Sequence, residues 1–403
     1  MGPSSARCSD VSNNVWAIII MNCTPSNPGP IARTFEAVQI LRGFAAGIVV
    51  FHHFCWTIRQ YHPQTSWLAT TGGIAETGAA GVDVFFCISG LVITHAARGL
   101  SPGKGTALTF TWRRVVRVLP MYWLFTAILL AAWVSGKALT SLIMTPQLVL
   151  ASLFLLPYPK RTIAGDFSLH PILDVGWTLT FEMYFYLLCS LIVFLGGGRR
   201  IFPWVFAALA AMAGFALVAG LVDTPAGSIL ASPMLVEFCG GVLLARFAEQ
   251  MADWNRRNEG WIGRASLLVG VAGLAGAASF PGAIDHRLLF WGVPGFFLTA
   301  GAMLTMVDAT RPVIRLLMFV GTASYTVYLA HPLATLAVGT AMKSGWFHSI
   351  NPDLLIVFLT LATVLATAST YPFLEGQAIK LARIGSRRGS EPRHGFGDPV
   401  KAP

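Results

Sequence analysis

The chain has 403 residues, 55% of them hydrophobic and only 11% charged, and carries a formal net charge of +10 at pH 7. Its mean hydropathy is +0.64. An aqueous fold cannot bury so much apolar surface, so the composition excludes a soluble globular protein. The basic charge could suggest a nucleic-acid partner, but it lies in loops between apolar blocks, as in membrane proteins, and we expect no nucleic acid.

Ten apolar blocks follow one another along the chain, most of them about 17 to 25 residues long, which is the length that crosses a bilayer as a helix. They cover residues 37–58, 78–95, 118–134, 172–195, 201–221, 229–247, 265–280, 288–307, 316–342 and 353–371. Because lipid offers no partner for an unpaired backbone amide, the blocks predict an all-α, polytopic membrane bundle of about ten transmembrane helices. The run Leu148–Leu156 is too short to span and is expected at the interface or as a re-entrant segment.

Lysine and arginine follow every second apolar block. They cluster after the second, fourth, sixth and eighth blocks and in the C-terminal tail, whereas the opposite loops hold few. Since cytoplasmic loops are enriched in these residues, the pattern predicts ten spans with both termini in the cytoplasm. We therefore divide the chain into a polar N-terminal tail (1–35), a transmembrane domain (36–377) and a basic cytoplasmic tail (378–403).

Ionisable residues inside the apolar blocks are unusual, because each costs roughly 2.5–3.5 kcal/mol on insertion scales and normally faces a cavity or a partner. They are Arg42, His53, Asp83, Glu182, Glu237, His331 and, just past the last block, Glu375. The six cysteines form no CxxC pair. We interpret them as buried small hydrophobes and expect no metal site.

Arg42 and His53 lie eleven positions apart in the first block. On a helix this spacing is three turns plus roughly 20°, so both side chains project from one face, about 16 Å apart along the axis. His52 points about 80° away from Arg42, which favours His53 as the inward-facing histidine and His52 as its support. The pair could serve both ends of an elongated substrate. Alternatively, the arginine packs helices and the histidine is structural.

The fourth block carries Thr178, Glu182 and Tyr186 at four-residue spacing, which forms a polar ladder on one helix face. A carboxylate beside hydroxyl groups can polarise an imidazole or accept a proton, or it can pair with an arginine of another helix. Trp177, next to the ladder, is typical of packing or of an interfacial aromatic belt.

Two further segments place polar groups one helical turn apart. Arg114 and Arg117 precede Tyr122 at a predicted cytoplasmic boundary. Guanidinium groups in such a pair suit a polyphosphate, although arginines at this boundary also follow from topology alone. In the ninth block, Ser324, Tyr328 and His331 share one face. They could line the same cavity or connect helices by hydrogen bonds.

Seven motifs occur in a fixed order between about residues 36 and 377. They are Arg42 and His53 with ten residues between them, GVDVFFCISG (81–90), RRVVRVLPMYW (113–123), GWTLTFEMYFYLL (176–188), EFCGGVLLARF (237–247), SYTVYLAHPL (324–333) and YPFLEGQ (371–377). In this order they resemble the acyltransferase-3 family of bacterial integral membrane acyltransferases, most closely its exopolysaccharide-production branch.

The resemblance implies an enzyme of the bacterial inner (cytoplasmic) membrane. It implies transfer of an acyl group, commonly acetyl, from acyl-CoA to a hydroxyl of a surface or secreted glycan or a lipid-linked oligosaccharide. Acetyl-CoA would be a donor substrate, with no permanently bound cofactor. Further partners would be membrane lipid and a polysaccharide biosynthesis complex.

The candidate catalytic residues are His53, Glu182 and Arg42. We expect His53 to act as general base or transient acyl carrier, Glu182 to orient it, and Arg42, Ser89 or a tyrosine to stabilise the oxyanion. The candidate substrate-binding residues are Arg114, Arg117, Ser89, Tyr122, Trp177, Tyr186, Tyr328 and His331. Embedded charges are also typical of a proton-coupled transporter or flippase for a polysaccharide precursor, and a structural subunit of an export complex is a third interpretation.

Overall fold

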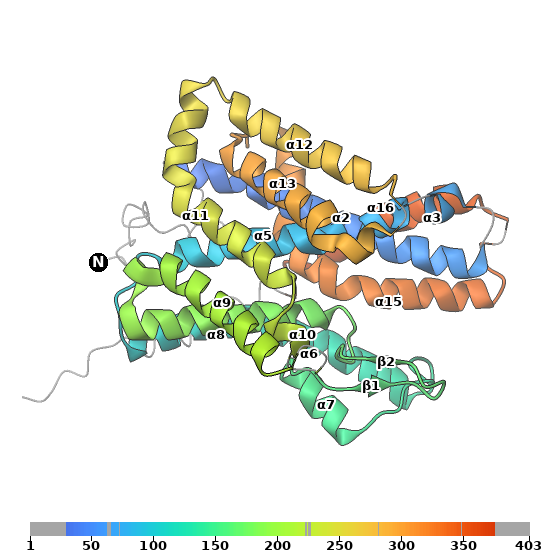
Figure 1. The fold of residues 1–403 in the computed structure, drawn as a ribbon. Helices are drawn as coiled ribbons and strands as arrows, with labels where there is room; N and C mark the ends of the chain where they lie inside the picture. Colours follow the sequence, from blue (N-terminus) through green and yellow to red (C-terminus); the bar gives the residue numbers. More distant parts are fainter. Residues whose placement is uncertain are drawn as a thin grey trace, which may run out of the picture.

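The computed structural model describes residues 30–62, 66–71, 73–221, 224, 227–280, 282–347 and 349–374, and these form a bundle that is nearly all helical (Figure 1). The long helices are α2 (Pro30–Tyr61), α5 (Ala80–Ala97), α6 (Lys104–Val134), α8 (Gly176–Gly196), α9 (Ile201–Val218), α11 (Met234–Arg257), α12 (Trp261–Ala277), α13 (Val293–Leu304), α14 (Pro312–Thr322), α15 (Ser324–Lys343) and α16 (Pro352–Thr370). The short helices are α3 (Trp67–Thr70), α4 (Ile74–Thr77), α7 (Pro146–Leu153) and α10 (Gly227–Leu230), with single turns η2 (Gly198–Arg200), η3 (Ala283–His286) and η4 (Leu288–Gly292). Strands β1 (Lys160–Arg161) and β2 (Phe167–Ser168) pair antiparallel.

The apolar blocks fall on helices. In the part of the chain that the structure describes, six helices are long and apolar enough to cross a membrane, or up to eight if each of two bent pairs is one span. The bent pairs are α11 with α12, at 109°, and α14 with α15, at 68°. The chain is thus a multi-pass membrane protein. The count of ten spans and the cytoplasmic location of the termini stay predictions. Residues 1–29 and 375–403, with Glu375 and most of both tails, lie outside the described residues. Helix α7 has eight residues, too few to cross.

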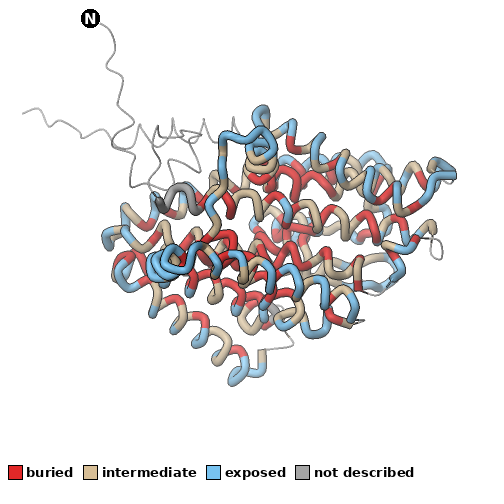
Figure 2. The backbone as a smooth tube through the Cα atoms, turned by 90° about the horizontal axis from the view of Figure 1, so that it is seen from above, coloured by how far each residue is buried: buried red, intermediate tan, exposed pale blue. Residues whose placement is uncertain are grey.

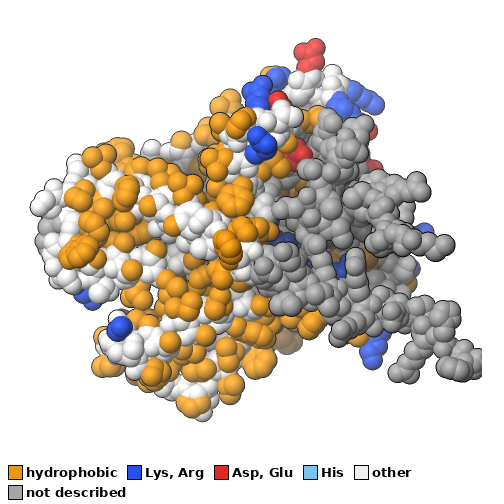
Figure 3. Space-filling model, turned by 180° about the vertical axis from the view of Figure 1, so that it is seen from behind, with side chains coloured by type: hydrophobic (Ala, Val, Ile, Leu, Met, Phe, Trp, Pro, Cys, Tyr) orange, Lys and Arg blue, Asp and Glu red, His pale blue; other side chains and the backbone are white. Residues whose placement is uncertain are grey.

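Buried residues lie toward the inside of the bundle, while exposed residues lie along its outer side (Figure 2). Many of the exposed residues are large and apolar. On the described part of the face seen in Figure 3, apolar side chains form broad patches, and most of the charged side chains in view lie toward one end. Such a surface is unfavourable in water and is the one expected against lipid.

Helix α5 lies at the centre of the bundle and packs most extensively against α11. Their backbones approach closely at Gly90 and Gly241. A Cβ atom on Gly90 would lie 2.2 Å from the Phe238 carbonyl oxygen, and one on Gly241 would lie 2.1 Å from that of Cys87. Small residues at a helix interface allow this close approach in membranes. The glycines of two sequence motifs therefore hold α5 and α11 together.

Replacing Gly241 by Ala is expected to destabilise the protein by about 1–3 kcal/mol, because the new methyl group must push two helix backbones apart. Thermal unfolding of the purified protein in detergent measures the loss as a lower Tm. Gly214→Ala in α9 is the matched control, since a Cβ there meets no atom within 4 Å. An equal Tm for the two variants would contradict this account of the interface.

Candidate active site

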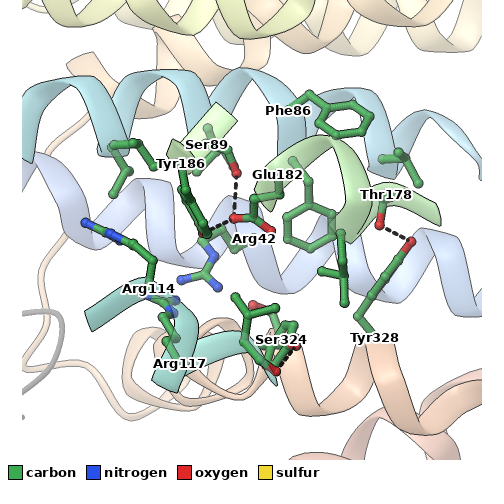
Figure 4. Close-up of a pocket in the computed structure, with 18 of the residues that line it drawn as sticks. Arg42, Phe86, Ser89, Arg114, Arg117, Thr178, Glu182, Tyr186, Ser324 and Tyr328 are labelled. Carbon is green, nitrogen blue, oxygen red and sulfur yellow. Dashed lines mark hydrogen bonds between the residues drawn. The ribbon is translucent and has the colours of Figure 1, made fainter. Parts of the chain in front are cut away.

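A cavity lies among α2, α5, α6, α8 and α15, and its empty space, counted out to its open mouth, is about 960 Å³. Its polar lining residues are Gln39, Arg42, Ser89, Arg114, Arg117, Thr178, Glu182, Tyr186, Ser324, Tyr325 and Tyr328. Figure 4 places the three arginines to one side of Glu182, and Thr178 with Tyr328 to the other. Five helices thus bring together most of the residues that the sequence singled out.

The arginine end of the cavity has an excess of positive charge. Its charged lining residues are Arg42, Arg114, Arg117 and Glu182, so three guanidinium groups face one carboxylate and the net charge is +2. Arg114 is only 5% exposed and lies against the Tyr186 ring, with 5.6 Å between guanidinium and ring centre. A guanidinium excess in an enclosed site favours an anionic ligand, and phosphate is the group that arginines bind best in bidentate fashion.

Glu182 is held by hydroxyl groups from two helices. The Tyr186 hydroxyl, one turn along α8, donates to Glu182 Oε1, and the Ser89 hydroxyl of α5 donates to the same oxygen at 3.3 Å. The carboxylate also interacts with the charge of Arg114. The contacts place Glu182 among arginines and hydroxyls, and no hydrogen bond to a histidine is found for it within the described residues.

The other end of the cavity is formed by Tyr328 of α15 and Thr178 of α8. Their hydroxyl oxygens lie 2.9 Å apart, and the Tyr328 hydroxyl also donates to the Val175 carbonyl oxygen at 3.2 Å. Because each hydroxyl belongs to a different helix, the pair connects α8 to α15 across the inner end of the cavity. Thr178 is therefore part of the predicted ladder but bonds to Tyr328 and not to Glu182.

Two histidines lie beyond Tyr328. The ring centres of His53 and His331 are 4.7 Å apart, and His331 lies 5.8 Å from the Tyr328 ring. Neither histidine lines the cavity that contains Arg42. Arg42 therefore lines the cavity and His53 does not, so the predicted single stripe on α2 is divided between two environments.

The hydrogen bonds of His53 determine its tautomer. His53 Nδ1 lies 2.8 Å from the Val49 carbonyl oxygen, and since a carbonyl only accepts, Nδ1 carries the proton. The other nitrogen, Nε2, keeps a lone pair that can accept a proton. His331 is 0% exposed, and neither of its ring nitrogens makes a hydrogen bond of ordinary geometry with a described residue. His52 Nδ1 lies 2.6 Å from the Ala75 carbonyl oxygen, so it connects α2 to α4, and its support of His53 stays a prediction.

A group of charged and aromatic side chains surrounds Trp177, next to the histidines. The His170 ring stacks on Trp177 at 5.7 Å, and the Arg287 guanidinium lies 5.8 Å from the same indole. Arg287 also donates two hydrogen bonds, of 2.9 and 2.8 Å, to the fully buried carboxylate of Asp83. This pair fixes the turn η4 to the start of α5.

Asp174, in the loop before α8, binds two basic side chains near the site. It accepts from Lys160 at 2.5 Å and contacts His170 at 3.2 Å. Burial raises the pKa of the Asp174 carboxyl, but the hydrogen bond to His170 and the charge of Lys160 lower it by more, so the net pKa lies well below its usual value. The carboxylate is therefore ionised at neutral pH, where it also interacts with His53.

Besides His331, two predicted binding residues, Tyr122 and Trp177, lie outside the cavity lining. Tyr122 is fully buried and donates to the Ser152 carbonyl oxygen at 2.8 Å, so it holds α6 to the end of α7. Trp177 packs against Phe86 and Phe181. Conversely, Gln39, Asp174 and Arg287 adjoin the site but were not predicted, because no motif or helical spacing in the sequence marks them.

The described residues contain no group of three or more His, Cys, Asp or Glu side chains placed to share a metal ion. An apolar helical bundle with an interior cavity that is lined by three arginines and one glutamate defines the class: an integral membrane protein with a charged interior site. Residues 35–371 match the family described as an acyltransferase domain, so the chain belongs to the acyltransferase-3 family and is a membrane acyltransferase.

A curated relative supports the same assignment. The chain is 28% identical over 322 residues to the exopolysaccharide production protein ExoZ of Rhizobium meliloti (strain 1021). The match covers 78% of this chain and 93% of ExoZ. No solved structure matches the chain significantly.

Proposed function

We propose that this protein is an O-acyltransferase of the bacterial cytoplasmic membrane, which transfers an acyl group, acetyl in the simplest case, from acyl-CoA to a hydroxyl of an exopolysaccharide. Family membership and the likeness to ExoZ support an acyltransferase linked to a polysaccharide. The single observation that carries the donor assignment is the cavity with net charge +2, which brings three arginines together and is lined at its other end by Tyr328.

The donor occupies the cavity in this proposal. Arg114 and Arg117 bind the phosphates of CoA, and the pantetheine arm runs past Glu182 toward Tyr328. Arg42 lies about 16 Å along α2 from His53, so it belongs with the phosphate-binding arginines and not at the reacting carbonyl. Tyr328, between the cavity and His331, is better placed to donate to the carbonyl oxygen of the thioester as negative charge develops there.

The acceptor approaches from the opposite end, where Trp177, His170 and Asp174 lie. His53 Nε2 takes the proton of the sugar hydroxyl as that oxygen attacks the thioester carbonyl. The carbon–sulfur bond then breaks, the ester forms, and the CoA thiolate receives the proton. His331, in ring contact with His53, supplies a second imidazole through which this proton can pass.

Radiolabelled acetyl-CoA tests the activity directly. The purified full-length protein, in nanodiscs, is mixed with the donor and with polysaccharide from a strain that lacks the protein. Label is expected in the polysaccharide as an alkali-labile ester, and the polysaccharide of the deletion strain should lack the mass of the corresponding acetyl groups. Transport of the polysaccharide without any transfer of label would overturn the proposal.

Replacing Arg117 by Gln is expected to raise the KM for acyl-CoA by about 10- to 100-fold, because one charge-assisted contact to phosphate is lost. The change in kcat should be much smaller. Arg113→Gln is the matched control, since Arg113 is exposed on the same helix and does not line the cavity. Steady-state kinetics at varied acyl-CoA measures both variants, and an equal KM for the two would count against a phosphate site at Arg117.

A further inference from the structure

A second cavity lies at the end of the bundle where α5 ends and α9 begins. Its lining residues are Arg98, Gly198, Arg199, Phe202, Arg246, Glu249 and Gln250. They come from the end of α5, the turn η2, the first turn of α9 and the middle of α11, and none of them lines the candidate active site. This is the end of the bundle that the distribution of basic residues predicts to face the cytoplasm.

The charge of this cavity is only partly compensated. Its single carboxylate, Glu249, accepts from Arg98 at 2.5 Å. Among the described residues, Arg199 and Arg246 have no hydrogen bond or ion pair. The Arg246 guanidinium instead lies over the rings of Phe202 and Phe247, at 5.8 and 5.3 Å. Two cationic groups therefore remain available to an anion, and three arginines against one glutamate give a net charge of +2.

The turn that carries Arg199 is fixed by close packing. The backbone nitrogen of Gly198 donates to the Leu100 carbonyl oxygen at 2.8 Å. A Cβ atom at position 198 would lie 1.9 Å from the Ala97 carbonyl oxygen, so only glycine fits. Because η2 is held against the end of α5, Arg199 and Arg98 stay at the same cavity, and an anion that binds there does not have to order a loop.

We propose that this cavity binds the phosphate of an anionic phospholipid. Basic pockets between transmembrane helices on the cytoplasmic side bind such headgroups, and guanidinium suits a phosphate. The surroundings favour a lipid over a free phosphate. Leu243 and Phe247 are 42% and 45% exposed beside Arg246 on α11, and they give an acyl chain an apolar surface that a soluble anion does not use. The site is independent of the proposed acyl transfer.

Native mass spectrometry of the detergent-solubilised full chain tests the site. Wild-type protein is titrated with dioleoylphosphatidylglycerol, dioleoylphosphatidylcholine and inorganic phosphate in separate arms. The double variant Arg199→Gln/Arg246→Gln removes the two uncompensated charges. Arg257→Gln/Arg264→Gln is the matched control, because it removes the same charge from exposed positions outside the cavity.

The wild type and the control are expected to bind phosphatidylglycerol more tightly than phosphatidylcholine, and the double variant should lose roughly 30-fold in phosphatidylglycerol affinity. Equal affinity for the two lipids in the wild type, or an equal loss in the control, would overturn the proposal. Displacement of phosphatidylglycerol by inorganic phosphate at equal concentration would also overturn it, since the site would then be one for free anions. If the double variant does not fold, the exposed single change Arg199→Gln gives the same test with a smaller expected loss.

Discussion

Replacing His53 by Gln is expected to lower the rate of acyl transfer by about 10²- to 10⁴-fold, the range over which a positioned general base contributes. Glutamine can keep the hydrogen bond to the Val49 carbonyl oxygen, but it offers no basic nitrogen where Nε2 now lies. The KM for acyl-CoA should change little, because His53 does not line the cavity assigned to the donor. Single-turnover transfer of label from acetyl-CoA to polysaccharide measures the chemical step.

His52→Gln is the matched control for this experiment. His52 is the adjacent residue on α2, and its Nδ1 donates to the Ala75 carbonyl oxygen, so its substitution tests packing without removing the proposed base. We expect a loss of less than about tenfold for this variant. A similar loss of acyl-transfer rate in both variants would assign the two histidines a structural role. If His53→Gln keeps the parental rate, His53 is not the general base.

Replacing Arg287 by Ala is expected to destabilise the protein by about 3–5 kcal/mol, the usual cost of removing one partner from a buried ion pair. Asp83 is 0% exposed, and Arg287 is its bidentate partner, so the variant leaves a buried carboxylate without its cationic partner. A lower Tm in detergent measures the effect. Arg161→Ala is the control, since Arg161 is exposed in β1 and forms no ion pair with a described residue.

A double variant separates the ion pair from general packing. Adding Asp83→Asn to Arg287→Ala removes the stranded charge, so the Tm of the double variant should lie above that of Arg287→Ala alone. If the two losses simply add, or if Arg287→Ala unfolds at the same temperature as Arg161→Ala, the buried pair is not what holds η4 to α5.

The local features of the site follow from helical periodicity and could be predicted. Thr178, Glu182 and Tyr186 line one cavity because four-residue spacing places side chains on one helix face. Arg114 and Arg117 share that cavity for the same reason. The helical nature of the apolar blocks follows from the lack of backbone partners in lipid.

Contacts between helices could not be predicted, because nothing in a single sequence specifies which faces meet. His53 and His331 are in ring contact across α2 and α15. Arg287 lies between the seventh and eighth apolar blocks, yet its side chain pairs with the buried Asp83 of α5.

The ninth block shows that local hydropathy does not predict where a helix bends. Residues 316–342 read as one span, but the helix breaks by 68° between α14 and α15. At this break Gly321 lies against α2, where a Cβ atom would be 1.9 Å from the Gln39 carbonyl oxygen. The close approach of two backbones determines this geometry, and hydropathy does not record it.

The hydrogen bond between Thr178 and Tyr328 has a consequence for the fate of the donor. In the proposed reaction the donor and the acceptor approach from opposite ends of the site, and Tyr328 lies where they would meet, because it lines the arginine-containing cavity and its ring is 5.8 Å from that of His331. Its hydrogen bond with Thr178 would then have to open before a thioester reaches the imidazoles, which would limit hydrolysis of the donor before the acceptor has bound.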